Sequence, residues 1–148
     1  MRIRDASGWT MFIFGILAFL LGLVGLIRPE VVLSILGFEI LIPAQRAAGD
    51  YTLVFMAAAS MASFNMGIYY VLAALNDVRI FYIWTVPFRI LTFTVFTTIT
   101  IMGIAPARFL GVGLWELLGA LATGFALYSD GKQKPERVNP RNAKKKRK

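Results

Sequence analysis

The sequence predicts an all-α membrane protein: a four-transmembrane-helix bundle with a short interfacial helix after the first span and a disordered basic C-terminal tail. Hydrophobic residues make up 57% of the 148 residues and charged residues only 16%, whereas charged residues make up about 25% of a typical soluble domain. The apolar residues form four long blocks separated by short polar breaks, and nearly half of the charged residues lie near the C-terminus. This pattern leaves room for one small helical membrane domain, residues 9–128, and for no second domain.

The first span is predicted over residues 9–27, after a head of residues 1–8. It contains no charge and begins with Trp9, an aromatic residue suited to the membrane interface. A signal peptide is the alternative interpretation. The apolar run is, however, longer than the usual hydrophobic region of a signal peptide, and it ends at Arg28 without a small-residue cleavage pattern. We therefore expect the segment to be retained as a membrane span.

A short helix is predicted over residues 29–37, directly after the first span. Pro29 is well placed in its first turn, and Gly37 lies just past its last turn. At a rise of about 1.5 Å per residue such a helix is far too short to cross a bilayer. Because apolar residues follow it, we expect it to lie on the membrane surface or to dip into it.

Three further apolar blocks predict three more spans: residues 51–75, 80–103 and 109–128. The second and third spans are joined only by residues 76–79, so we expect them to be antiparallel neighbours. Pro87 removes one helical hydrogen bond in the third span and is expected to bend it near Arg89. After the fourth span the composition changes to Lys, Arg, Pro and Asn, and residues 129–148 are expected to be a disordered tail.

Four spans place both termini on one side of the membrane. Basic residues gather on that side: Arg2 and Arg4 in the head, Arg79 between the second and third spans, and the lysines of the tail. The positive-inside rule therefore predicts that both termini are cytosolic. The net charge of +8 lies mostly in the tail, so we expect the tail to touch anionic lipid and predict no nucleic-acid partner.

The end of the tail, residues 144–148, allows a further interpretation. Lys145 and Lys146 resemble the dilysine retrieval signal of eukaryotic endoplasmic-reticulum membrane proteins, an address that a receptor reads. A nuclear import signal also matches this basic run, but four membrane spans argue against it. For a eukaryotic source, the match predicts residence in the endoplasmic reticulum.

Three strongly polar side chains lie inside the spans at one depth: Asn65, Arg89 and Glu116. Each is roughly 14–18 Å from the predicted cytosolic end of its helix at 1.5 Å per residue. An arginine at this depth costs roughly 2.5–3.5 kcal/mol, so it requires a partner or water. We predict that Arg89 pairs with Glu116 and that Asn65 completes the hydrogen bonding. Tyr69 follows Asn65 by one helical turn and shares its face, which makes these four residues the candidate ligand-binding set.

Three functions for this polar centre remain open. The ion pair could only fix the helix register, or the centre could bind a lipid-like ligand or a membrane partner. A membrane enzyme acting on an isoprenoid or sterol-like substrate, with Glu116 as the acid/base, is the third. Binding is the function we favour.

No metal site and no cofactor are predicted. The chain has no Cys and no His, which removes thiolate chemistry and the commonest metal ligand. The acidic residues on the far side of the membrane, Glu30, Glu39 and Asp50, are too scattered for a metal site.

The layout of the chain can be compared with known families. Residues 29–37, Pro-Glu-Val-Val-Leu-Ser-Ile-Leu-Gly, follow the first span as a proline-led short helix, and residues 111–120 make the last span rich in glycine. In this layout, residues 9–128 resemble the DoxX-like small four-helix integral membrane proteins. The resemblance implies a four-helix bundle with no agreed catalytic residues. The basic tail is not part of that pattern.

Overall fold

The computed structural model describes residues 3–133; residues 1–2 and 134–148, which include Lys145 and Lys146, lie outside this description. Every regular element within residues 3–133 is helical, so the predicted fold class is confirmed. Four helices are long and apolar enough to cross a membrane. These long helices are α1 (Ala6–Ile27), α3 (Thr52–Leu75), α4 (Arg79–Ile101) and α5 (Leu110–Gln133). The short elements are α2 (Pro29–Leu36) and the 3-10 turns η1 (Pro43–Gln45) and η2 (Ala107–Phe109).

The short helix α2 begins and ends where the sequence predicts. Pro29 occupies its first turn, and Gly37 ends it with a left-handed backbone, φ 84°. The backbone N–H of Phe38 donates to the Leu33 carbonyl at 2.9 Å and that of Gly37 to the Ser34 carbonyl at 3.1 Å, the bond pattern of a Schellman motif. Beyond this end, the Phe38 ring packs edge-on against Phe109, with centroids 5.9 Å apart. The segment after α2 therefore contacts η2, the turn that directly precedes the last span.

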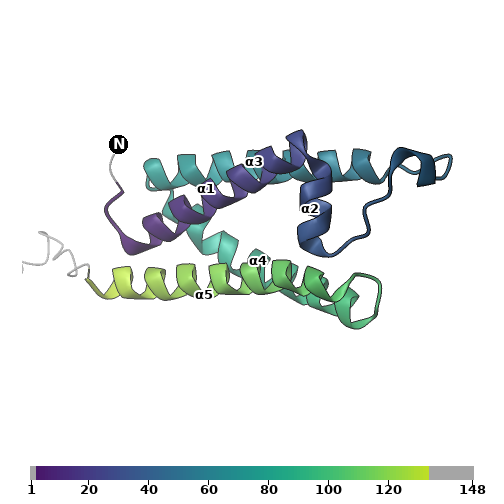
Figure 1. Ribbon diagram of the computed structural model, residues 1–148. Helices are drawn as coiled ribbons and strands as arrows, with labels where there is room; N and C mark the ends of the chain where they lie inside the picture. Colours follow the sequence, from purple (N-terminus) through teal and green to yellow (C-terminus); the bar gives the residue numbers. More distant parts are fainter. Residues whose placement is uncertain (1–2, 134–148) are drawn as a thin grey trace, which may run out of the picture.

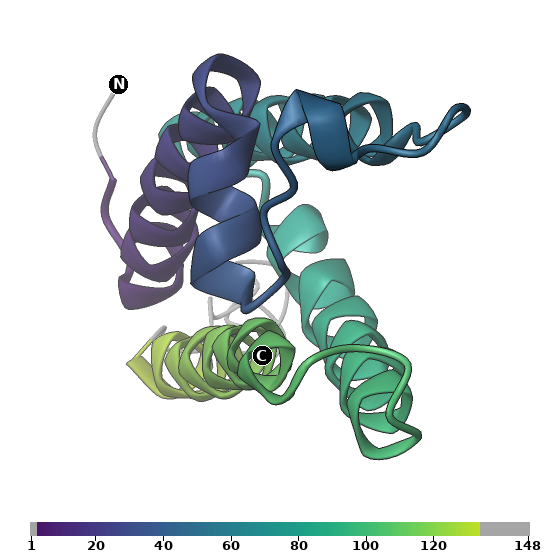
Figure 2. The same ribbon diagram turned by 45° about the vertical axis from the view of Figure 1, so that its right-hand side comes forward.

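The long helices associate as two pairs. α1 packs along α3, and α4 packs along α5, with the two pairs meeting mainly through α1 and α5. Figure 1 shows α1 crossing α3 in one layer and α5 beside α4 in the other. The second and third spans were expected to be antiparallel neighbours, but α3 and α4 contact each other at few positions and diverge beyond their connection (Figure 2).

Small residues explain why α3 pairs with α1. A Cβ atom at Gly22 would overlap the backbone of Phe64, and one at Gly67 would overlap the backbone of Phe19. The two helix backbones can approach this closely only because neither glycine has a side chain. The Ser63 hydroxyl also donates to the Ala18 carbonyl at 3.0 Å across this contact. The glycine-rich face of α1 thus explains why α3 packs against α1, and α4 packs against α5 instead.

An end cluster formed by Asp5, Ser7, Arg79 and Asp130 joins three helices. The Asp130 carboxylate accepts hydrogen bonds from the backbone N–H groups of Ala6, at 3.2 Å, and Ser7, at 2.9 Å. These amides open α1 and have no partner within it. Arg79, at the start of α4, donates to Asp5 at 3.3 Å and to the Leu127 carbonyl at 3.4 Å. The beginning of α1 and the end of α5 therefore lie together.

The end cluster corrects one boundary of the sequence analysis. Residues 129–133 were expected to belong to the disordered tail, but they continue α5, and Asp130 is buried. The physical reason is that Asp130 accepts hydrogen bonds from the N-terminal N–H groups of α1. Its charge therefore belongs to the bundle and not to the polar tail.

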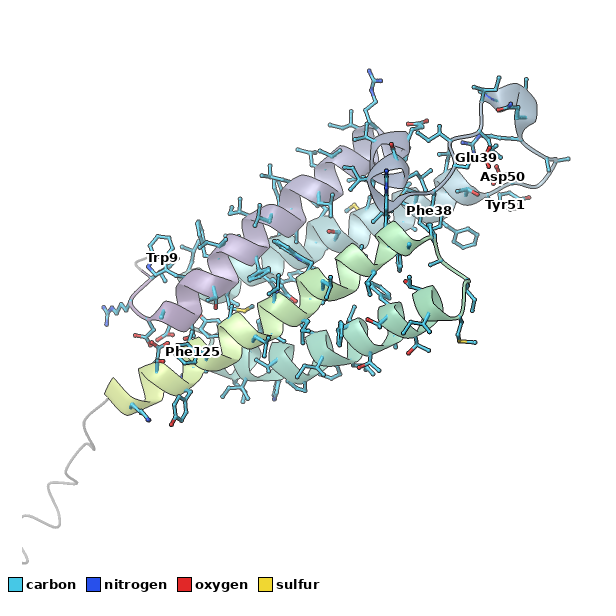
Figure 3. The ribbon with its side chains drawn as sticks, turned by 60° about the horizontal axis from the view of Figure 1, so that its bottom comes forward. Trp9, Phe38, Glu39, Asp50, Tyr51 and Phe125 are labelled. Atoms are coloured by element: carbon cyan, nitrogen blue, oxygen red, sulfur yellow. The ribbon has the colours of Figure 1, made fainter. Side chains whose placement is uncertain are left out.

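Aromatic side chains mark both ends of the bundle. Figure 3 shows Trp9 and Phe125 toward the end where α1 begins, and Tyr51 beside Asp50 at the opposite end. All three aromatic residues are exposed, as expected for side chains at a membrane interface. Asp50 accepts hydrogen bonds from the Thr52 hydroxyl at 2.5 Å and its backbone N–H at 2.9 Å. These bonds, helped by the charge of Arg46, hold the pKa of Asp50 below its usual value.

Candidate functional site

The Arg89 side chain is buried where the two helix pairs face each other. Arg89 follows Pro87 on α4, and the residue as a whole is only 3% exposed. Its guanidinium carbon lies 4.5 Å from the ring centroid of Phe14 on α1 and 4.9 Å from that of Tyr70 on α3, both within the range of a cation–π contact. A Cβ atom at Gly119 on α5 would overlap Nη1 of Arg89. Residues from all four long helices therefore form this site.

Arg89 and Glu116 form the central pair. The structure brings Arg89 Nε to 3.8 Å from Glu116 Oε2, a distance that gives charge attraction but is too long for a hydrogen bond. Nε and Nη1 of Arg89 are buried without a hydrogen-bond partner in the described residues. The Glu116 carboxylate likewise accepts no hydrogen bond within residues 3–133. Because buried polar groups are almost always hydrogen-bonded, the open donors of Arg89 require an explanation. The Glu116 side chain, 23% exposed, is only partly buried.

The other two predicted site residues, Asn65 and Tyr69, lie away from the central pair. The Asn65 side chain is partly buried and contacts neither charge by a hydrogen bond in the described chain. Tyr69 is 55% exposed. The residues that α3 directs toward Arg89 are instead Met66 and Tyr70, each one position further along the helix. Since successive residues are about 100° apart around a helix, the face of α3 that lines the space beside Arg89 is rotated by that angle from the face of Asn65 and Tyr69.

A hollow of about 310 Å³ lies beside the central pair, between α3 and α4. Its lining comprises Met66, Tyr70, Phe81, Trp84, Thr85, Phe88, Arg89, Thr92 and Glu116. The volume is near the lower end of the range for small-molecule sites, roughly 300–1,000 Å³. It exists because α3 and α4 follow different partners and diverge. We call this space the lateral hollow, because the exposed side chains of Met66, Trp84 and Phe88 place its mouth on the apolar outer surface.

The hydroxyl donors of the two lining threonines are already used. The Thr85 hydroxyl donates to the Tyr82 carbonyl at 2.8 Å, and the Thr92 hydroxyl donates to the Phe88 carbonyl at 3.0 Å. Such bonds to the preceding helical turn are typical of threonine in apolar helices. The groups of the lateral hollow that remain able to hydrogen-bond a ligand are therefore those of Arg89 and Glu116. Aromatic rings and methyl groups form most of the wall.

One pattern that sequence reasoning missed connects the central pair to the end cluster. Glu116, Thr123 and Asp130 recur every seven residues along α5 and so lie on one face of the helix. Thr123 contacts the Thr10 hydroxyl of α1 at 3.2 Å, and Asp130 binds the start of α1. The seven-residue spacing was the available signal that α5 turns this face toward α1. Tyr70 carried no comparable signal.

The described part of the chain contains no group of three or more side chains able to hold a metal ion. Comparison with family models, with curated proteins and with solved structures finds no match to this chain. The four apolar spans define its class: it is a small multi-pass integral membrane protein.

Proposed function

We propose that this protein binds a lipid-like molecule in the lateral hollow, with the polar end of the ligand against Arg89 and Glu116. One observation carries the proposal: Arg89 is 3% exposed, yet its buried Nε and Nη1 have no hydrogen-bond partner among residues 3–133. A charge so placed in a membrane span is by default a reason to propose a functional site. A ligand oxygen at this point would supply the missing acceptor.

The position of the hollow supports entry from the bilayer. Its mouth is formed by Met66, Trp84 and Phe88 on the apolar outer surface of two membrane spans. A hydrophobic molecule could therefore reach Arg89 without crossing water. Its apolar part would contact aromatic rings, and only its polar end would meet the central pair.

A matched pair of variants tests the proposal. Met66 and Met61 both lie on α3 and are 43% and 45% exposed, but only Met66 lines the hollow. Met66→Trp should fill the mouth, so lipids that copurify with the wild type should be depleted in mass spectra of the purified variant. Met61→Trp should leave them unchanged. Equal lipid content in the wild type and both variants would contradict binding in the hollow.

The enzyme alternative is favoured by one feature, since Glu116 is the only carboxylate among the described residues that line the same hollow. As an acid/base, Glu116 would act on an isoprenoid or sterol-like substrate bound there. Loss of turnover in Glu116→Gln, with ligand binding retained, would favour this alternative.

Orientation and localisation are proposals of the same kind. The beginning of α1 and the end of α5 lie together, and the basic residues of the sequence gather at that end, which supports a cytosolic side for both termini. Accessibility tags at Met1 and Lys148 should both report the cytosol, and a tag near Arg46 should not.

Several sequence predictions stay predictions. They are the dilysine address of Lys145 and Lys146, the contact of the tail with anionic lipid, a membrane-protein partner and the DoxX-like resemblance. For a eukaryotic source, replacing both lysines by Ser should release the protein from the endoplasmic reticulum. An unchanged distribution would reject the address.

A further inference from the structure

The chemistry of the central pair narrows the class of ligand. We infer that the lateral hollow recognises a neutral, largely hydrocarbon molecule with one hydroxyl group, such as a terpenoid or sterol-like alcohol. This inference rests on the proposed function, because it concerns what binds in the same hollow.

Two open hydrogen-bonding partners favour a hydroxyl group. Arg89 has donors without an acceptor, and Glu116 has acceptor oxygens without a donor, within the described chain. A hydroxyl both donates and accepts, so a single ligand oxygen can satisfy both residues. The distance also fits: Nε and Oε2 are 3.8 Å apart, which is less than the sum of two hydrogen bonds of about 2.7–2.9 Å.

Charge disfavours the ionised alternatives. Arg89 and Glu116 neutralise each other at 3.8 Å. A carboxylate or phosphate on the ligand would place a second negative charge beside Glu116, and an amine would place a second positive charge beside Arg89. In a water-poor interior either repulsion is large. A pure hydrocarbon would leave both polar groups unpaired.

The wall of the hollow suits the rest of such a molecule. Phe81, Trp84 and Phe88 supply aromatic surface, and Trp84 and Phe88 remain exposed at the mouth. A volume of about 310 Å³ accommodates the hydroxyl end and the first part of the hydrocarbon. The remainder would continue past these rings into the bilayer. A single polar end on an apolar body is therefore the shape that the site accepts.

The test uses four probes with one hydrocarbon body: geranylgeraniol, its methyl ether, the corresponding carboxylic acid and the corresponding amine. Each competes with a photoactivatable analogue of the alcohol for labelling of the full-length protein in lipid nanodiscs. We expect the alcohol to compete at least about tenfold better than the others, because each of them leaves a buried group unpaired or repelled.

A charge-swap variant makes the test sharper. Glu116→Gln keeps the size of the side chain and removes its charge, so Arg89 is left without a counter-charge. The preference should then invert, with the acid competing better than the alcohol. The wild-type probe series requires no variant, so it decides the ligand class even if Glu116→Gln does not fold.

The outcomes separate this inference from the proposed function. An acid or amine that competes best in the wild type overturns the hydroxyl inference and leaves lipid binding in place. A methyl ether that competes as well as the alcohol also overturns it. The ligand would then not need to donate a hydrogen bond to Glu116, because water would hydrogen-bond the central pair. If no probe competes, or if Met61→Trp weakens labelling as much as Met66→Trp, the proposed function itself fails.

Discussion

The end cluster and the central pair are built from similar parts but differ in how far their hydrogen bonds are satisfied. Both place an arginine of α4 near a carboxylate of α5. Arg79 donates to Asp5 and to a main-chain carbonyl, and Asp130 accepts two main-chain N–H groups. Arg89 and Glu116 make no hydrogen bond within the described residues.

Exposure makes this contrast informative. The Arg79 side chain is 29% exposed and the Arg89 side chain only 4%. Burial should make hydrogen bonding more necessary, yet the more buried arginine is the one without partners. The difference indicates that the end cluster holds the helices together, and it supports our proposal that the central pair binds a partner from outside the chain.

The largest expected effect is that of Glu116→Leu. It leaves the buried Arg89 charge without a counter-charge, a change that typically costs about 3–5 kcal/mol. Reversible unfolding in mixed detergent–lipid micelles measures the loss. Combining it with Arg89→Met removes the stranded charge, so the double variant should be more stable than Glu116→Leu alone. Strictly additive losses would show that the two residues do not interact.

Asp130→Ala is expected to have the next largest effect on the free energy of unfolding. It removes the acceptor of two N–H groups at the start of α1, of which that of Ser7 is buried, and hydrogen bonds to a charged group contribute about 1.5–3 kcal/mol. Asp130→Asn keeps one acceptor oxygen and should lose less. An Ala variant as stable as the wild type would show that the end cluster does not hold α1.

Phe14→Leu should cost less, about 0.5–2 kcal/mol, because it removes one of the two rings that contact Arg89. The same substitution in an Arg89→Met background is the control. There the cost should shrink by the cation–π contribution. An identical cost in both backgrounds would mean that Phe14 stabilises the bundle by packing alone, including its contact with Trp115.

Arg79→Gln should have the smallest effect, about 0.2–1 kcal/mol, because its pair with Asp5 is partly exposed. Its cost should fall further at 1 M salt, where exposed charges are screened. The cost of Glu116→Leu should respond to salt much less. If the two costs fall equally with salt, the central pair is no more shielded from solvent than the end cluster.

The sequence predicted what depends on hydropathy and on local backbone chemistry. Four apolar blocks became four spans, and Pro29 with Gly37 bounded α2 as expected. Equal depth along the helices was enough to anticipate that Arg89 and Glu116 approach each other. These features need no knowledge of which helices are neighbours.

The remaining features depend on helix pairing and rotation. Every span is apolar on most of its circumference, so hydropathy does not indicate which face meets which helix. For this reason the sequence predicted Tyr69 beside the central pair, whereas Tyr70 contacts Arg89. For the same reason α3 and α4 were expected to be neighbours. Asp130 was assigned to the tail because its partners are more than a hundred residues away in the chain.

The bond between Asp130 and the start of α1 also sets an order of events during synthesis. Asp130 follows Ala6 by 124 residues, which corresponds to about 6 to 25 seconds of translation at 5–20 residues per second. Throughout that interval the first turn of α1 must keep its free N–H groups in water or at the lipid headgroups. Only when the last span has been made can α1 exchange those contacts for Asp130, so the first span reaches its final state last.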